Sequence, residues 1–250
     1  MEHLIPYDLT IIQWILAVFC GMIIGMSKTG ISGTGLIAVP VLAAIFGGKP
    51  SVGLLLPMLV IADIFAVKFY NRHADWKYVL ILLPWAIAGI LIALLIGQSV
   101  NDVQFRFLIA LVVVVGLLLM LIQDLRKKDI TIPSAWWFSA ILGLTGGFAT
   151  MIGNAAGPIM AFYLLSMRLP KNIYIGTGAW FFLIVNLFKV PLHIFFWKTI
   201  TVESLSFDLL MILPILAGAL SGYYLIKLIP EKAYRLFIII TTLISAIALF

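Results

Sequence analysis

Long apolar runs follow one another along almost the whole chain and decide what it can fold into. They cover about 9–26, 35–46, 51–70, 78–97, 105–122, 134–149, 155–169, 172–197, 205–229 and 234–250. A helix that crosses a bilayer needs about 20 apolar residues, and several of these runs reach that length. The chain is 64% hydrophobic and only 10% charged, against roughly 45–50% and 25% in soluble proteins. The sequence therefore predicts an all-α, polytopic membrane protein with a single transmembrane domain over residues 1–250.

Two stretches rich in glycine and polar residues interrupt this pattern. The first, residues 25–40, reads Gly-Met-Ser-Lys-Thr-Gly-Ile-Ser-Gly-Thr-Gly-Leu-Ile-Ala-Val-Pro, and the second, residues 143–158, contains Thr145, Thr150 and Asn154. The apolar runs beside them fall below the length of a crossing helix. We interpret each stretch as the break in a broken helical hairpin, either re-entrant or fully spanning.

The two halves of the chain resemble each other. At a spacing of about 120–130 residues, the following pairs match: Pro40 with Pro158, Asp63 with Asn186, Pro84 with Pro214, and Arg106 with Arg235. We interpret the halves, about 9–124 and 134–250, as pseudo-repeats. Each would consist of a broken hairpin followed by three transmembrane helices.

The basic residues indicate that the repeats are inverted. A continuous helix over residues 9–46 would extend about 57 Å at 1.5 Å per residue, too far for one pass through about 30 Å of hydrocarbon. If each hairpin instead returns to its starting side, the cytoplasmic side collects Lys68, Arg72, Lys77, Arg126, Lys127, Lys128, Arg168, Lys171, Lys227, Lys232 and Arg235. The other side keeps only Lys49, Arg106 and Lys198. This asymmetry is typical of membrane proteins, and inverted repeats with broken helices are typical of transporters.

Lys28 is the first candidate functional residue, because a lysine inside an apolar segment costs about 2.5–3.5 kcal/mol on insertion scales. A lysine whose ammonium reaches the membrane surface is the alternative interpretation. Glycines near it leave backbone N–H groups accessible, and a cation beside such groups favours an anion. The candidate substrate-binding residues of this stretch are Ser27, Lys28, Thr29, Gly30, Gly33 and Gly35.

A second polar face lies in the run 172–197. Asn186, Lys189 and His193 are three and four residues apart, so they share one helix face. Asn154, Asn186 and Lys189 are predicted to complete the anion site. Asp63, the repeat mate of Asn186, is a candidate for proton coupling; a structural ion pair with Lys28 or Lys189 is the alternative.

Other function classes lack their signatures. The basic residues form no block, so no nucleic acid is expected as a partner. Cys20 is the single cysteine and the histidines are few and scattered, so neither a metal nor another cofactor is predicted. No Walker motif or nucleophile elbow is present, which argues against an enzyme. We read four Gly-x3-Gly pairs as close helix contacts; they begin at Gly21, Gly143, Gly153 and Gly218.

Motifs along nearly the whole chain resemble the sulfite exporter TauE/SafE family, also called the sulfonate uptake permease family. The motifs are Gly-x-Ser-Lys28-Thr-Gly-x-x-Gly-x-Gly-x4-Pro40, Leu56-Pro-x5-Asp63, Pro84-Trp85, Asn154-Ala-Ala-Gly-Pro158, Tyr163-Leu-Leu, Pro170-Lys171, Thr177-Gly-Ala-Trp-Phe-Phe and Asn186-Leu-Phe-Lys189-Val-Pro191. Through this resemblance Thr177 joins the candidate substrate-binding residues.

The resemblance implies a secondary transporter of sulfite, sulfoacetate or other organosulfonates in a bacterial inner membrane, usually acting as an exporter. The expected partners are a small anionic substrate, the lipid bilayer and, if Asp63 is a coupling residue, protons. An anion channel and a carrier for a small carboxylate are the alternatives. The sequence does not indicate an oligomeric state.

Overall fold

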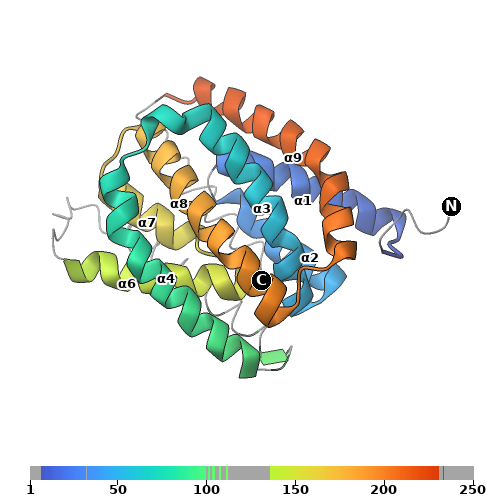
Figure 1. Ribbon diagram of the computed structural model, residues 1–250. Coiled ribbons are helices and arrows are strands. Elements are labelled where there is room, and N and C mark those ends of the chain that lie inside the picture. Colours follow the sequence, from blue (N-terminus) through green and yellow to red (C-terminus); the bar gives the residue numbers. More distant parts are fainter. Residues whose placement is uncertain are drawn as a thin grey trace.

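The long apolar runs fold as helices, as Figure 1 shows. The computed structural model describes residues 7–31, 33–99 and 136–230, with 101, 103, 104, 107, 111 and 233 as isolated positions. The long helices are α1 (Ile11–Thr29), α3 (Gly48–Tyr70), α4 (Trp76–Ser99), α6 (Trp136–Gly153), α8 (Lys171–Leu192) and α9 (Val202–Leu228). The described residues are helical or in turns and loops, which confirms the all-α prediction for this part of the chain.

Six described segments are long and apolar enough to cross a membrane. They are α1, α3 extended to His73, α4, α6, α8 extended to Trp197, and α9. The shortest, α6, has 18 residues, which is about 27 Å of helix and close to the thickness of the hydrocarbon core. The predicted runs at 105–122 and 234–250, which would complete the two repeats, fall almost entirely outside the described residues.

Two shorter helices follow the predicted breaks. After α1, a 3₁₀ turn at Thr34–Ile37 leads into α2 (Ala38–Phe46), and after α6 the chain enters α7 (Gly157–Ser166). Neither α2 with its preceding turn nor α7 reaches the length of a crossing helix. Each of these short helices packs against the long helix before it; that the two form a hairpin stays a prediction.

Two capping boxes fix where long helices begin. The Thr10 hydroxyl accepts a hydrogen bond from the Gln13 backbone N–H at 3.3 Å, and the Gln13 side chain accepts one from the Thr10 N–H at 2.9 Å. Thr201 and Ser204 make the same exchange at the start of α9. Each box satisfies backbone donors that a helix start leaves unpaired.

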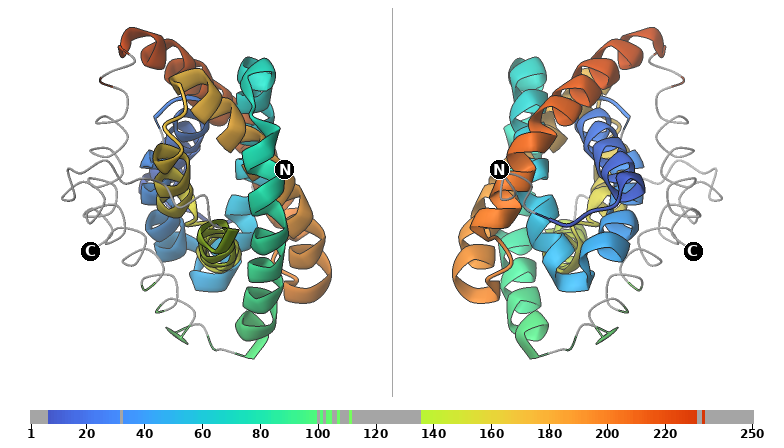
Figure 2. Two further views of the ribbon diagram at one scale, coloured as in Figure 1. Left: turned by 90° about the vertical axis from the view of Figure 1, so that its left-hand side faces the viewer. Right: turned by 90° about the vertical axis from the view of Figure 1, so that its right-hand side faces the viewer.

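The helices pack in oblique pairs. α1 lies against α9, α4 against α6, and α3 against α8 and α9. Figure 1 shows the α1–α9 pair and the α4–α6 pair on opposite sides of α3 and α8. Figure 2 shows the same arrangement from the left-hand and right-hand sides of Figure 1. The centre of the described part is therefore formed by α3 and α8, which contain Asp63, Asn186 and Lys189.

Glycines permit the closest of these contacts. A Cβ atom added to Gly218 would lie 1.9 Å from the Met22 carbonyl oxygen, and one added to Gly147 would lie 2.0 Å from that of Ala86. Such positions hold the α1–α9 and α4–α6 pairs together through backbone contact. The interpretation was wrong for the pair beginning at Gly153: an added Cβ on Gly157 would meet no atom within 4 Å. These two glycines instead flank the break between α6 and α7.

Candidate functional site

The first break begins later than the sequence pattern suggested. α1 stays helical through Thr29, so Lys28 lies in the last helical turn, where a cation faces the negative end of the helix dipole. The turn that follows requires glycine at Gly33, whose φ is +97°. It also requires glycine at Gly35, where an added Cβ would lie 2.8 Å from the Ser27 hydroxyl. The backbone of Gly33 and Gly35, which carry no side chains, thus lies close to Ser27 and Lys28.

Lys28 forms an ion pair inside the helix bundle. Its Nζ lies 2.9 Å from Oδ1 of Asp63, which comes from α3. The Lys28 side chain is 13% exposed and the Asp63 side chain is fully buried. The ammonium also lies over the Phe182 ring, 4.0 Å from its centroid, a cation–π contact that helps to hold a desolvated cation. The predicted pairing of Asp63 with a lysine is realised with Lys28.

Asp63 connects the first half of the chain to the second. Its Oδ2 accepts a hydrogen bond from Nδ2 of Asn186 on α8 at 2.6 Å. Asn186 is 1% exposed, so this charge-assisted bond is made away from water, where such bonds are strong. The ion pair and the amide therefore form one buried polar unit.

Lys189 is held by a different set of oxygens. Its Nζ donates to the Thr150 carbonyl and to the Thr150 hydroxyl at 2.9 Å each, and to Oδ1 of Asn154 at 2.6 Å. Three oxygen neighbours match the three N–H donors of an ammonium. Lys189 is fully buried, and none of these three contacts is with a carboxylate.

Asn154 links Lys189 to the second break. Its φ of +53° places it in the left-handed region, which asparagine tolerates better than most residues, and it lies directly after the end of α6. While Oδ1 accepts from Lys189, Nδ2 donates to the Val52 carbonyl in the first turns of α3 at 3.0 Å. Asn154 thereby fixes the second break against both α3 and α8.

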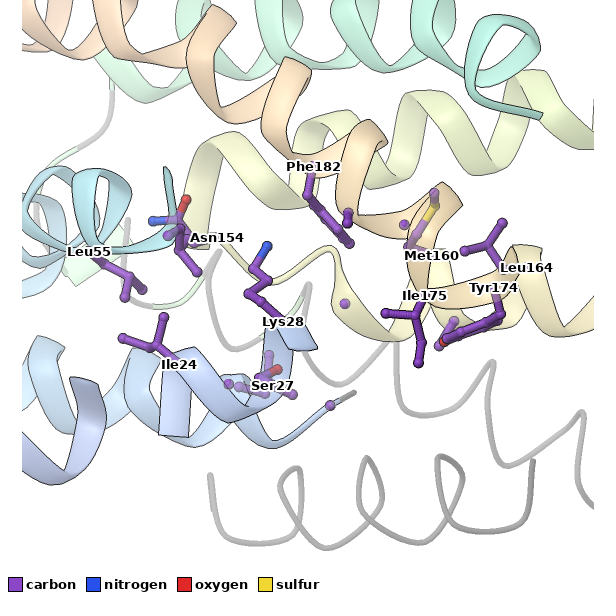
Figure 3. A pocket seen from close by; sticks show the side chains of 18 residues that line it. Ile24, Ser27, Lys28, Leu55, Asn154, Met160, Leu164, Tyr174, Ile175 and Phe182 are labelled. Atoms are coloured by element: carbon purple, nitrogen blue, oxygen red, sulfur yellow. The ribbon is translucent and has the colours of Figure 1, made fainter. Parts of the chain in front are cut away.

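A cavity of about 90 Å³ lies between the two breaks. It is smaller than the roughly 300–1,000 Å³ of pockets for drug-sized ligands, so it suits a small solute. In Figure 3 the Lys28 ammonium lies between Asn154 and Phe182. The remaining wall is mostly apolar and comes from α1, the 3₁₀ turn Thr34–Ile37, α3, α7 and α8. It includes Ile24, Leu36, Leu55, Leu59, Met160, Ala161, Leu164, Tyr174, Ile175 and Ala179.

The structure brings five of the predicted binding residues to this cavity: Ser27, Lys28, Gly33, Gly35 and Asn154. Asn186 and Lys189 do not line the cavity. Asn186 instead contacts Asp63, the partner of Lys28, and Lys189 contacts Asn154.

The other three predicted residues face neighbouring elements. The Thr29 hydroxyl donates to the Ala219 carbonyl of α9 at 2.8 Å. An added Cβ on Gly30 would lie 2.6 Å from the Gly222 carbonyl, also on α9. The Thr177 hydroxyl accepts from the Asp75 N–H, just before α4, at 2.9 Å. Thr29, Gly30 and Thr177 therefore fix the helices around the cavity without reaching its surface.

Phe182 contacts Lys28 but was not predicted from the sequence to be a site residue. It precedes Asn186 by four residues, so it extends the helix face already marked by Asn186, Lys189 and His193. The four-residue spacing between Phe182 and Asn186 is the sequence signal that could have identified Phe182. His193, at the far end of this face, makes a separate contact with the Thr199 hydroxyl, 2.8 Å from Nδ1.

Metal chemistry finds no support in the described residues. No group of three histidine, cysteine, aspartate or glutamate side chains among them could hold a metal ion. What the site offers instead is two lysines, one carboxylate, amide groups and exposed backbone around a small cavity.

Comparisons with known proteins identify the family of the chain. No curated protein and no solved structure matches the chain. The family model described as sulfite exporter TauE/SafE matches residues 17–249, which include both breaks and all the residues of the cavity. This chain therefore belongs to the sulfite exporter TauE/SafE family.

Proposed function

We propose that the protein is a secondary transporter that exports small sulfur-containing anions, such as sulfite, sulfoacetate or other organosulfonates, across a bacterial inner membrane by alternating access. Its family is one of membrane transporters and not of enzymes. The observation that carries the proposal is the excess of cationic groups in the polar cluster at and behind the cavity wall: Lys28 lines the cavity, and behind it lie Lys189 and the carboxylate of Asp63.

The binding site is assigned as follows. Lys28 supplies the charge, Ser27 and Asn154 supply polar side chains, and Gly33 and Gly35 leave backbone amides accessible at the cavity wall. Asn186 and Lys189 hold Asp63 and Asn154 in place from behind. In a site of low dielectric, groups that are already oriented bind an anion without a further cost of rearrangement.

An inverted repeat is part of this proposal, and the packing supports it. If α1 corresponds to α6, α3 to α8 and α4 to α9, exchanging the halves turns the α1–α9 pair into the α6–α4 pair. The same exchange maps the α3–α8 pair onto itself. The bond between the repeat mates Asp63 and Asn186 is the kind of contact expected at a two-fold axis.

The cavity is lined by residues next to the predicted cytoplasmic side, and we propose that the structure corresponds to an inward-facing state. In Figure 3, Leu164 and Tyr174 lie at the end of the cavity away from Asn154. Leu164 is near the end of α7 and Tyr174 near the start of α8, next to the predicted cytoplasmic loop 168–171. On the other side, Trp197 packs so closely on α4 that an added Cβ on Gly97 would lie 2.3 Å from its ring.

Asp63 is the proposed proton-coupling residue. Lys28 and Asn186 contact its two oxygens, and Lys189 is the second cation of the cluster. A substrate anion that takes Lys28 as its counter-ion leaves Asp63 without its own. Protonation would then remove the unpaired buried charge.

A binding screen tests the proposal. Purified protein is heated with sulfite, sulfate, methanesulfonate, sulfoacetate and small carboxylates, and the midpoint of thermal unfolding is recorded. A bound ligand stabilises the folded state by an amount that grows with the logarithm of its concentration relative to its Kd, so sulfur oxyanions should raise the midpoint and do so less in Lys28→Ala. A carboxylate that stabilises the protein more than any sulfur oxyanion would contradict the assigned substrate class.

A further inference from the structure

Asp208 is a buried carboxyl group that the anion site does not use. It lies on α9, is 2% exposed, and neither of its two oxygens has a hydrogen-bond partner among the described residues. Asp63 is also buried, but it has Lys28 and Asn186 as partners. Most buried polar atoms are paired, so a buried side chain with two unpaired oxygens requires an explanation.

The position of Asp208 on α9 removes the usual local partners. Asp208 lies six residues after Val202, the first residue of the helix. It is therefore beyond the first turn, where free N–H groups and the helix dipole stabilise carboxylates. One turn earlier on the same face, the Ser204 hydroxyl donates to the Thr201 carbonyl at 3.0 Å. Its single O–H is thus not available to Asp208.

No cation among the described residues pairs with Asp208. Tyr7, which precedes α1, is within electrostatic reach of both Asp208 and Glu203, and neither Tyr7 nor Glu203 can supply positive charge. α2 reaches this end of α9 through Phe46, which packs on Phe207, and α2 contains no titratable residue. These segments therefore offer Asp208 only neutral or acidic neighbours.

The two helices that pack along α9 use their lysines elsewhere. On α1, Lys28 pairs with Asp63. On α3, Lys49 donates to the Gly97 carbonyl of α4 at 2.7 Å. The other titratable residues of these helices are Cys20 on α1 and Asp63, Lys68 and Tyr70 on α3. An ionised Asp208 would therefore be a buried charge without a counter-ion, and buried carboxyl groups avoid this state by keeping their proton.

We infer that Asp208 is a second proton-binding site of the protein, that the proton is bound in this structure, and that it can leave only after water or a cation reaches the start of α9. A neutral carboxyl group loses much less on burial than a carboxylate, so the proton takes the place of the missing counter-ion. Ionisable residues inside membrane segments mark functional sites by default. The site is distinct from Asp63, whose charge Lys28 balances in the same structure.

Infrared spectroscopy of the purified full-length chain in lipid tests the inference without any substrate. A protonated carboxyl group gives a C=O stretching band that is separate from the bands of amides and carboxylates and that shifts in heavy water. Exposed aspartates and glutamates lose their protons near about pH 4 and do not contribute at about pH 7. The wild type should show the band at about pH 7, and Asp208→Asn should lose it. Glu203→Gln, the matched control at an exposed position in the first turn of α9, should keep it.

Thermal unfolding gives a second measurement, which does not require the variant to be as stable as the wild type. The unfolded chain releases the Asp208 proton above about pH 4, whereas the folded protein keeps it. Wild-type stability therefore falls as pH rises, by up to about tenfold in the unfolding equilibrium per pH unit for one proton. From about pH 5 to about pH 7, the unfolding midpoint of the wild type should fall relative to that of Asp208→Asn. Relative to Glu203→Gln it should stay constant.

Three results would overturn the inference. The first is a wild-type spectrum without the carboxyl band at about pH 7, or a band of equal size in Asp208→Asn. The second is a band that appears only after sodium and potassium ions are removed, which would assign Asp208 to a metal cation. The third is a difference between the midpoints of the wild type and Asp208→Asn that does not change with pH. Neither measurement uses a sulfur anion, so these results leave the proposed transport untouched, and a failure of anion binding leaves the Asp208 site untouched.

Discussion

At the scale of single residues, the molecule is organised by a few charged groups that a bilayer tolerates only when they are paired. Lys28 and Asp63 form an ion pair at 2.9 Å, and Lys189 uses three neutral oxygens instead. In the proposed mechanism, the first arrangement exchanges one anion for another, because the substrate replaces the Asp63 carboxylate as the partner of Lys28. The second holds Asn154 in place and keeps a positive charge behind the cavity.

Asp63→Asn tests the coupling role. The amide preserves the shape of Asp63 but cannot bind and release a proton, so the dependence of transport on pH should flatten. In the wild type, flux should fall as pH rises. Fewer carriers then bind the proton that neutralises Asp63 once Lys28 has paired with the substrate. The measurement is sulfonate uptake into proteoliposomes at a series of equal internal and external pH values. A profile identical to that of the wild type would leave Asp63 as a structural ion-pair partner only.

Substitutions at Asn154 separate the effect of its backbone conformation on stability from the effect of its side-chain hydrogen bonds. At its φ of +53°, alanine is strained by about 1–2 kcal/mol, whereas glycine is not. Asn154→Gly and Asn154→Ala both lose the bonds to Lys189 and Val52. We therefore expect Asn154→Ala to unfold at the lower temperature, opposite to the ranking of helix propensity. Equal midpoints of thermal unfolding would show that the left-handed turn is not maintained in solution.

The sequence was sufficient to find these residues but not their partners. Lys28, Asp63 and Lys189 stand out because each interrupts an apolar run, and that cost is visible without a structure. Which lysine pairs with Asp63 depends on the relative rotation of α1, α3 and α8, which no local pattern specifies. The same rotation turns Thr29 and Gly30 toward α9 and away from the cavity.

At the scale of helices, glycine determines how closely the oblique pairs approach. Gly147 and Gly146 are neighbours on α6 with opposite surroundings: an added Cβ would lie 2.0 Å from the Ala86 carbonyl in the first case and 3.5 Å from Ile159 in the second. Gly-x3-Gly spacing identified Gly147 in advance. It misassigned Gly157, because the end of α6 cannot be recognised from glycine spacing alone.

Gly147→Ala and Gly146→Ala form a matched pair of substitutions. Alanine favours a helix over glycine by about 1 kcal/mol at either position, but at position 147 it must push α4 away from α6. We expect Gly147→Ala to lower the thermal unfolding midpoint of the protein in detergent, and Gly146→Ala to leave it unchanged or raise it. A stable Gly147→Ala protein would contradict the close α4–α6 contact.

At the scale of the whole molecule, the proposed transporter has two halves that face opposite sides of the membrane. The all-helical fold and its many crossing segments were predictable from the lengths of the apolar runs, since the bilayer limits the choices of backbone structure. The inverted repeat rests on matched residues, on the distribution of basic residues and on the exchange of the α1–α9 and α4–α6 pairs.

Cysteine labelling tests the predicted orientation. Cys20 is buried and is the single cysteine of the chain, so Cys20→Ala provides a background without a thiol. Arg72 and Lys198 are exposed and are predicted to lie on opposite sides. In intact cells, an impermeant maleimide added from outside should label Lys198→Cys and spare Arg72→Cys. The reverse pattern, or labelling of both, would contradict the topology.

Counterflow in proteoliposomes tests whether Lys28 at the cavity binds the transported anion. Vesicles loaded with unlabelled methanesulfonate are diluted into the labelled compound, and transient accumulation of label distinguishes a carrier from a channel. The wild type and the exposed-lysine control Lys77→Ala should show saturable counterflow. Lys28→Ala, and the charge-balanced pair Lys28→Met with Asp63→Asn, should show none. Normal counterflow in the Lys28 variants would show that Lys28 does not bind the transported anion.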